Sequence, residues 1–338
     1  MISSFFNYQI YFLSIILIIY YSCYLKLDLI SKIFNLYDYP DGKRKFHEIK
    51  TPLLGGVFIF LAIFLYLIIL PNLFDSKYEY FYFYSYKSIV SFFMCYLSIF
   101  VLGFLDDKYS ISPDKKLILL FIICYVYVIS DNTVRINDLR LDFINLDIKI
   151  DKFSPIFTCI VIVSFLMLSN MFDGINGQSS LFFIFLIITL GLNNHHILNF
   201  LIFLVLLIFI FLIYNIRSKI FLGDNGIFVL GFIISILFLK TYNIYGNLNF
   251  DQLILLSLIP LVDMIRVSTT RIFKGKNPMK PDATHIHHLI KGTKSKLIKI
   301  NFLTISPIIL YSLFGNFVFS SIFLLLIYAY FLFNKVNK

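Results

Sequence analysis

Residues 221–231 read FLGDNGIFVLG, a short polar island between two apolar runs. The glycines at 223 and 226 allow the backbone to turn tightly and to approach a ligand closely. A carboxylate at such a turn, here Asp224, is suited to hold a cation and the phosphate that it carries. A plain turn between two helices has the same composition, so the stretch has to be interpreted together with the rest of the chain.

Three further polar islands interrupt the apolar sequence: GFLDD at 103–107, NMFDGING at 170–177 and PDATHIHH at 281–288. The chain around them has 338 residues, of which 59% are hydrophobic and 14% are charged, with a mean hydropathy of +0.85. A soluble domain carries about 25% charged residues. The composition therefore predicts an all-α integral membrane protein with a single polytopic domain over 1–338.

The hydropathy predicts about eleven transmembrane helices, since a span needs roughly 20 apolar residues and sometimes as few as ~17. The predicted spans lie near 8–25, 52–71, 88–105, 117–130, 156–169, 179–192, 197–214, 227–240, 252–269, 302–314 and 316–334. Cytoplasmic loops of membrane proteins carry an excess of Lys and Arg. With 26–51 placed inside, the basic residues left outside are Lys77, Lys87, Arg135, Arg140, Lys149, Lys152 and Lys240. All four islands then fall on the cytoplasmic side, which indicates one shared site.

Two regions lack an obvious catalytic pattern. The segment 131–155 alternates apolar and polar residues, which predicts a short structural β-hairpin near 133–150 on the outer face. Cysteines at 23, 95, 124 and 159 lie in apolar runs, which is typical of buried thiols.

The net charge of +10 would suit nucleic acid, but in a membrane protein it favours basic loops with anionic lipid or phosphate partners and no nucleic acid.

Asp106 and Asp107 lie where the third predicted span meets the cytoplasm. Acids at a membrane boundary need a partner, so the pair is compatible with Mg²⁺ or a basic phosphate clamp, or with exposed acids that end a helix. Lys115 and Lys116 follow one loop later. They either balance phosphate charge or extend their ammonium groups into the interface.

The island at 170–177 places Asn170, Asp173 and Asn176 three residues apart, so on a helical turn they would share one face. Amides and carboxylates together read a nucleobase edge or bind a metal; the alternative is a helix-ending turn. Asp263, inside the ninth predicted span, is either a functional acid or an ion-pair partner of Arg266. In the basic loop 271–301, the HxHH pattern favours phosphate or base contacts over a zinc cluster, because no clear remaining ligands lie nearby.

Taken together, these motifs resemble the polyprenyl-phosphate N-acetylhexosamine-1-phosphate transferases of glycosyltransferase family 4, in particular the bacterial undecaprenyl-phosphate GlcNAc-1-phosphate transferases. The resemblance spans nearly the whole chain in family order. It is carried by DYPDGKRKFH at 38–47, TPLLGG at 51–56, GFLDD, NMFDGING, FLGDNG at 221–226, and 260–290 with its PDATHIHH. The chain departs from many bacterial members at Asn176, where they have Asp, and at Ile227, where they have Ser.

The resemblance implies a role for each motif. Mg²⁺, or Mn²⁺ in its place, would be bound by Asp224 with Asn170 nearby. Asp106, Asp107 and Lys116 would be the catalytic residues. The substrate-binding residues would be Lys45, Asn170, Asp173, Asn176, Gly223, Arg271, His285, His287 and His288.

The implied reaction moves an amino-sugar 1-phosphate from a UDP-amino sugar to undecaprenyl phosphate. It releases UMP and starts a lipid-linked cell-surface polysaccharide. The expected location is the bacterial cytoplasmic membrane, with the site facing the cytoplasm and membrane lipids or a second copy as partners. The alternatives are the phospho-N-acetylmuramoyl-pentapeptide transferase reaction of the sister branch, a polytopic transporter, or an inactive scaffold. Polar groups at one face and the absence of a repeat argue against a transporter.

Overall fold

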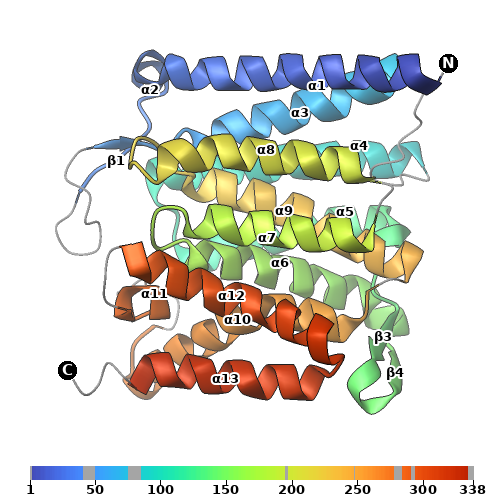
Figure 1. Cartoon of the computed structure of the whole chain (residues 1–338). Helices are drawn as coiled ribbons and strands as arrows, with labels where there is room; N and C mark the ends of the chain where they lie inside the picture. The colour runs from blue at the N-terminus through green and yellow to red at the C-terminus, as the bar shows by residue number, and fades with distance from the viewer. Residues whose placement is uncertain are drawn as a thin grey trace.

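A computed structural model describes residues 2–40, 50–74, 85–194, 197–246, 248–277, 284–290 and 294–333. Lys45 lies outside the described residues. So do most of the basic stretch that precedes TPLLGG, and the Pro281–Ala283 part of the histidine island. Most helices of the described chain are stacked with their axes roughly along one direction, and α1 begins at the end of the stack opposite to the one where α13 finishes (Figure 1).

Apolar sequence is what builds the long helices, because a helix satisfies its own backbone hydrogen bonds where no water is available. In chain order the α-helices, including the short α2 and α11, are α1 Ile2–Leu25, α2 Leu27–Phe34, α3 Gly55–Phe74, α4 Tyr86–Tyr109, α5 Pro113–Ser130, α6 Ser154–Phe172, α7 Gln178–Asn193, α8 Leu198–Asn215, α9 Gly223–Lys240, α10 Phe250–Phe273, α11 Ile286–Leu289, α12 Lys294–Phe314 and α13 Phe317–Phe333.

Each of the predicted spans falls on one of these helices. By length and hydropathy, however, 5 of the described helices qualify as membrane-spanning, or 6 if α1 and α2 are taken as one span bent by 76°. The apolar helical stretches Gly55–Ile69, Gln178–Leu192 and Phe317–Phe333 are 10–17 residues long, shorter than the roughly 20 residues of a typical span. The larger number of crossings therefore stays a prediction.

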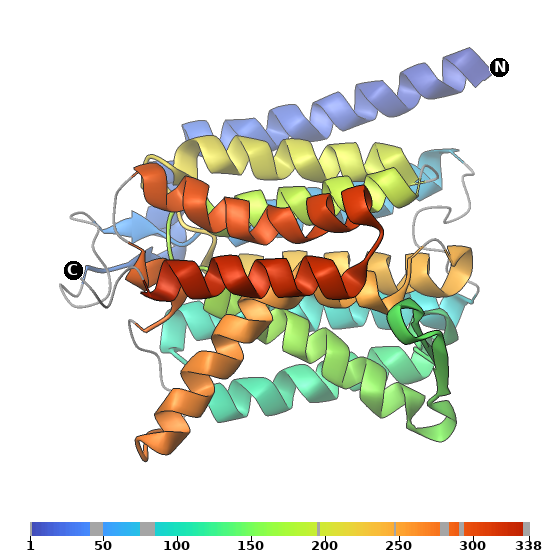
Figure 2. The same ribbon diagram turned by 60° about the horizontal axis from the view of Figure 1, so that its bottom comes forward.

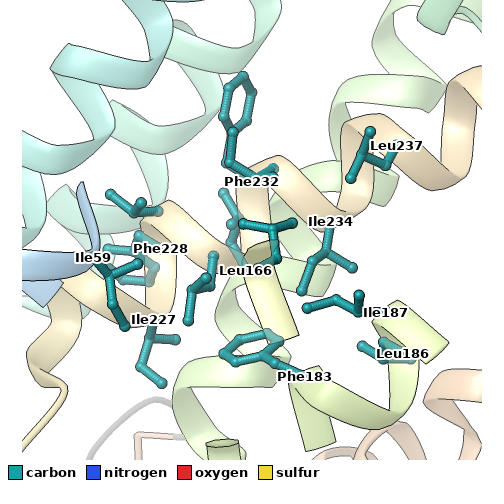
Figure 3. Close-up of a cluster of buried hydrophobic side chains, with 14 of the residues drawn as sticks. Ile59, Leu166, Phe183, Leu186, Ile187, Ile227, Phe228, Phe232, Ile234 and Leu237 are labelled. Carbon is teal, nitrogen blue, oxygen red and sulfur yellow. The ribbon is translucent and has the colours of Figure 1, made fainter. Parts of the chain in front are cut away.

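Helix α9 is the centre of the bundle. Its residues from Asn225 to Lys240 are all buried, and it packs against α3, α4, α6 and α7. Figure 3 shows the resulting cluster, in which Ile227, Phe228 and Phe232 of α9 meet side chains such as Leu166 of α6. The stretch FLGDNG is the N-terminal end of this central helix, so its polar residues are placed by the best-packed element of the protein.

A two-stranded antiparallel hairpin is present within 133–150, as the alternation predicts. It consists of β3 Asp138–Leu141 and β4 Leu146–Lys149, with Leu139 opposite Ile148. The Phe143 N–H of its turn donates to Asp251 Oδ2 at the start of α10, 3.0 Å away. The hairpin lies at the end of the bundle opposite to the short sheet of β1 Tyr37–Asp38 and β2 Thr51–Pro52 (Figure 1). Its predicted outer location stays a prediction.

At the hairpin end, several of the basic residues assigned to the outside have fixed partners. Lys240 is buried and forms an ion pair with Asp131, with 3.0 Å between Nζ and Oδ2. Arg135 donates to the carbonyl groups of Val128 and Ile129 in the last turn of α5. Because these cations are bound within the fold, they do not contradict the charge bias of the opposite end.

Candidate functional site

The site is built around the N-terminus of α9. Gly223 has a φ of +74°, a conformation that glycine adopts without strain. The backbone N–H groups of Asp224 and Asn225 donate to the two carboxylate oxygens of Asp107, at 2.8 and 3.1 Å. The Asn225 side-chain amide also donates to Asp107 Oδ2. Asp107 thereby accepts orphan donors from the first turn of α9, and its charge is stabilised by the positive end of the helix dipole.

Glycines in α3 and α4 allow this turn to be approached from two sides. A Cβ on Gly56 would overlap Asn225 and Gly226, and one on Gly103 would overlap the Asn225 backbone. The Gly56 N–H donates to the Leu222 carbonyl at 2.9 Å, and the Phe221 N–H donates to the Pro52 carbonyl at 2.8 Å. TPLLGG therefore pairs with FLGDNG through the backbone, which is a structural reason for both motifs.

Lys116 joins two acids that are far apart in the sequence. Its Nζ lies 2.7 Å from Asp224 Oδ2 and also contacts Asp106 Oδ2. Asp106 is fixed by the Ile111 N–H, which donates to its other oxygen at 2.7 Å. Because Lys116 is buried and paired, the interface-exposed reading of this lysine is wrong; Lys115 beside it is exposed.

The charges at this point do not balance. Among the residues that the structure describes, Asp106, Asp107 and Asp224 meet one ammonium group, that of Lys116, so these groups keep an excess of negative charge when they are ionised. Such an excess attracts a cation. The Asn170 side chain lies next to Asp224, and a carboxylate beside an amide offers the hard oxygen atoms that Mg²⁺ prefers.

A metal cage of three or more His, Cys, Asp or Glu side chains is absent from the residues that the structure describes. Mg²⁺ does not need one, because it is commonly held by one or two carboxylates and by substrate phosphates. The donor set fits such a loosely held ion. It offers no support for a structural zinc site at the histidines.

The island at 170–177 does not form the helical turn that was predicted for it. Helix α6 ends at Phe172, and Gly177 has a φ of +85°, so Asn170, Asp173 and Asn176 do not share a helix face. The Asn170 side chain lies next to Asp224. The Asn176 amide instead donates to Ser218 Oγ at 2.7 Å. The spacing predicted one cluster of these polar side chains. In the structure Asn170 lies near Asp224, whereas Asn176 contacts Ser218.

Asn215 holds these two parts of the site together. Its side-chain oxygen accepts from the Gly177 N–H at 2.6 Å, and its amide donates to the Ile220 carbonyl at 2.9 Å. Sequence analysis did not identify Asn215 or Ser218 as site residues. The available signal was an amide at the end of the apolar run 197–214, at the same end of the bundle as the acids.

The histidine segment reaches the site through His287. A Cβ on Gly174 would overlap the His287 ring, so the two residues are in close contact. The rings of His285 and His287 are parallel within 2°, with centroids 5.6 Å apart. The backbone of His288 is in α11, and its side chain is outside what the structure describes.

Helix α10 carries two polar residues that the sequence singled out. Asp263 is buried, and its Oδ1 pairs with Arg266 at 2.7 Å, as the ion-pair reading predicts; its Oδ2 also bonds to His285. Arg271 is buried near the end of the helix. Figure 2 shows α10 running obliquely to the other helices, so that this end projects from the bundle.

The sequence of this chain is similar to those of several known proteins. The sequence model described as "Glycosyl transferase family 4" matches residues 89–242. An undecaprenyl-phosphate alpha-N-acetylglucosaminyl 1-phosphate transferase of Thermotoga maritima is 26% identical over 281 residues, covering 82% of this chain and 81% of the relative. The protein of the same name from Pasteurella multocida is 41% identical over 75 residues, 22% of this chain and 21% of its own. A phospho-N-acetylmuramoyl-pentapeptide-transferase of Prochlorococcus marinus is 28% identical over 287 residues, covering 76% and 75%.

Proposed function

We propose that this chain, whose residues 89–242 match the sequence model of glycosyl transferase family 4, is a membrane enzyme that transfers a sugar 1-phosphate to a polyprenyl phosphate. The single observation that carries this proposal is the contact of Lys116 with Asp106 and Asp224 at the N-terminus of α9. The cluster combines an anionic site for a cation with an ammonium group for phosphate. Phosphoryl transfer needs both, because it depends mainly on positioning and on charge stabilisation.

The finer proposal is the transfer of an N-acetylamino-sugar 1-phosphate, GlcNAc-1-phosphate or a related amino sugar, from a UDP-sugar to undecaprenyl phosphate. An oxygen of the lipid phosphate forms a bond to the β-phosphorus of the donor, the bond to the UMP oxygen breaks, and UMP leaves. The lipid phosphate is an anionic nucleophile near neutral pH, since the second pKa of a phosphomonoester is about 6. It therefore needs little activation, and its correct placement contributes most of the rate.

Each acid has a different task in this proposal. Asp224, with Asn170, is the Mg²⁺-binding pair, and the bound ion would neutralise charge on the diphosphate. Asp106 keeps Lys116 in place, and Lys116 is the cation for the substrate phosphates. Asp107 already accepts three hydrogen bonds from the first turn of α9, so we assign it to holding the loop that carries Asp224.

The remaining predicted residues would bind the donor. Asp173 and Asn176 are assigned to the uridine, and His285, His287 and His288 to the sugar or its phosphate. Lys45 and Arg271 are assigned to substrate phosphate. The position of His287 against Gly174 supports the histidine assignment, because it places the histidine segment beside the 170–177 island.

The proposed location is the cytoplasmic membrane of a bacterium, with the acidic site facing the cytoplasm, where a nucleotide sugar is available. A homodimer is a further expectation. The acids lie at helix ends on one side of the bundle and not midway along the helices, which favours an interfacial enzyme over a transporter.

The test is mass spectrometry of lipid products. Purified protein is incubated with undecaprenyl phosphate, Mg²⁺ and each of several UDP-amino sugars, including UDP-GlcNAc and UDP-N-acetylmuramoyl-pentapeptide. We expect one donor to give a diphosphate-linked lipid together with stoichiometric UMP. Product only from the muramoyl donor would move the chain to the sister branch. Absence of product from every donor, while a known family member is active in the same assay, would refute the transferase proposal.

A further inference from the structure

Asp263 is the most heavily engaged side chain outside the acidic cluster. It lies in the middle of α10, is 2% exposed, and receives hydrogen bonds from three separate parts of the chain. Arg266 and the Tyr328 hydroxyl of α13 each donate to its Oδ1 at 2.7 Å. His285 Nδ1 lies 2.8 Å from its Oδ2. The Ile286 N–H lies 3.2 Å from both carboxylate oxygens.

These contacts fix the histidine segment, residues 284–288, at Thr284, His285 and Ile286. The same Arg266 guanidinium that pairs with Asp263 also donates to the Thr284 carbonyl at 2.7 Å. Residues 284, 285 and 286 are therefore each bound to α10 through one ion pair. A buried carboxylate with this many donors has little freedom to rotate, so it is a firm reference point for the His285 ring.

His285 in turn is connected to the proposed donor site. Its ring is parallel to that of His287, which lies against Gly174. A carboxylate that accepts from one ring nitrogen sets which nitrogen carries the proton and which remains for other partners. With Nδ1 bonded to Asp263, Nε2 is the nitrogen of His285 that is left for a ligand.

We propose that Asp263 is a positioning residue for the transfer reaction: it orients His285 so that Nε2 faces the sugar-phosphate donor. Arg266 and Tyr328 hold the Asp263 carboxylate, and Asp263 holds the ring. This inference rests on the proposed function, since it needs a donor for His285 to contact. Because Nδ1 carries the proton that is donated to Asp263, Nε2 is an acceptor, and the chemical group that it recognises is a hydroxyl of the nucleotide sugar.

The first test is a double-mutant cycle of Asp263→Asn and His285→Ala, with kcat and KM measured for the UDP-sugar. We expect each single variant to lower kcat/KM by roughly 10-fold to 100-fold, the range for loss of a hydrogen bond to a charged group. If Asp263 acts through His285, the double variant is no slower than His285→Ala alone. Multiplied losses in the double variant would overturn the proposal, because Asp263 would then act independently of the ring.

The second test does not depend on Asp263→Asn folding. Nδ-methylhistidine incorporated at position 285 removes the Nδ1 hydrogen bond but leaves Nε2 and the other donors to Asp263 in place. The expected result is a roughly tenfold or greater loss of kcat/KM in the folded fraction, measured at a temperature at which the variant remains folded. Full activity with the methylated ring would refute the positioning role.

A matched control separates positioning from general stability. Asp131 is also a buried aspartate in an ion pair, but it lies at the hairpin end of the bundle. Asp131→Asn should lower thermal stability while the folded fraction keeps wild-type kcat and KM. Failure of the proposed function would appear as an inactive wild-type protein, whereas failure of this inference appears only in the variants of an active one.

Discussion

At the scale of single residues, the two adjacent aspartates of GFLDD have separate partners. Asp106 contacts the Lys116 ammonium, and Asp107 accepts from the amides of α9. Successive residues on a helix point about 100° apart, because there are ~3.6 residues per turn. One acid therefore faces Lys116 of α5, and the other faces the first turn of the central helix α9.

Asp224→Asn tests the cation site. Asparagine keeps the size of the side chain but removes the charge that Mg²⁺ requires, and Lys116 keeps its contact with Asp106. We expect turnover to fall by at least about 100-fold, a loss typical of removing one electrostatic contact from an active site. Thermal stability should be nearly unchanged. Measurement of turnover against Mg²⁺ concentration checks this, and normal turnover at ordinary Mg²⁺ would remove Asp224 from the site.

Asp107→Asn should behave differently from Asp224→Asn. An amide nitrogen cannot accept from the Asp224 and Asn225 N–H groups, so at least one buried donor loses its partner. The expected cost is about 1–3 kcal/mol of unfolding free energy, together with lower activity. Thermal unfolding in detergent measures the first quantity. If Asp107→Asn keeps full stability and loses only turnover, Asp107 is a catalytic residue after all.

At the scale of elements, the close contact of α3, α4 and α9 explains how an acidic cluster is held at helix ends. Each contact uses a glycine where a methyl group would collide with backbone atoms. Small residues at helix crossings are common in membrane proteins, because they let backbones approach. The site depends on this packing, since Asp107 and Asp224 are on different helices.

Gly103→Ala tests the crossing of α4 and α9. The new Cβ would lie 2.7 Å from the Asn225 backbone nitrogen, so the helices must separate. Overpacking of this kind costs about 1–3 kcal/mol. Gly191→Ala in α7 is the matched control, because its nearest neighbours are 3.6 Å away and alanine favours the helix by up to about 1 kcal/mol. Equal stability changes in the two variants would show that the α4–α9 distance is not critical.

The Asp131–Lys240 pair connects α5 to the end of α9. Although burial acts to raise it, the pKa of Asp131 is lowered by the Lys240 ammonium and by hydrogen bonds from Thr133. Lys240→Met should cost about 3–5 kcal/mol, because it leaves a buried charge without its partner. Activity per folded molecule should not change. Thermal unfolding of a solubilised sample provides the measurement.

The same pair predicts a pH dependence. A carboxyl with a lowered folded pKa contributes stability above its unfolded pKa of about 3.9 and loses it as the pH falls through the folded pKa. The stability difference between wild type and Asp131→Asn should therefore shrink as the pH is lowered from 5 towards 3. A difference that stays constant over this range would show that Asp131 is not ionised in the fold.

At the scale of the whole molecule, the hairpin and the acidic cluster lie at opposite ends of the helical stack (Figure 1). If the stack crosses a membrane, one of these ends faces the cytoplasm and the other faces out. The charge bias predicts that the acidic end is cytoplasmic.

Cysteine labelling tests this orientation. Asn277 follows α10 and Asp147 lies in β4, and both side chains are exposed. Each is changed to Cys in a protein that lacks the four native cysteines, all of which are free thiols. On intact cells, an impermeant thiol reagent should label position 147 and not 277, and both should react after permeabilisation. Labelling of 277 alone would reverse the orientation and with it the proposed cytoplasmic site.

Much of this protein could be predicted from its sequence, because hydropathy and short motifs are local properties. The apolar runs specify helices, because a helix forms its own backbone hydrogen bonds where no water is available. The alternation of apolar and polar residues at 138–149 specifies a hairpin. The motifs with Asp106 and Asp224 indicated one site, since four polar islands in an apolar chain needed a common explanation. Lys116 was included because it lies at the start of the next helix.

Partners across the bundle are decided only by tertiary structure. Asp106 and Asp107 are chemically identical neighbours, and the packing of α4 on α9 alone gives one to Lys116 and the other to backbone amides. The prediction that the polar residues of 170–177 share one helix face was wrong, because α6 ends at Phe172 and helical periodicity does not apply beyond it. The contact between Asp263 and His285 also could not be predicted from the sequence. These residues are 22 positions apart, and their contact depends on where the intervening loop folds back, which no local pattern encodes.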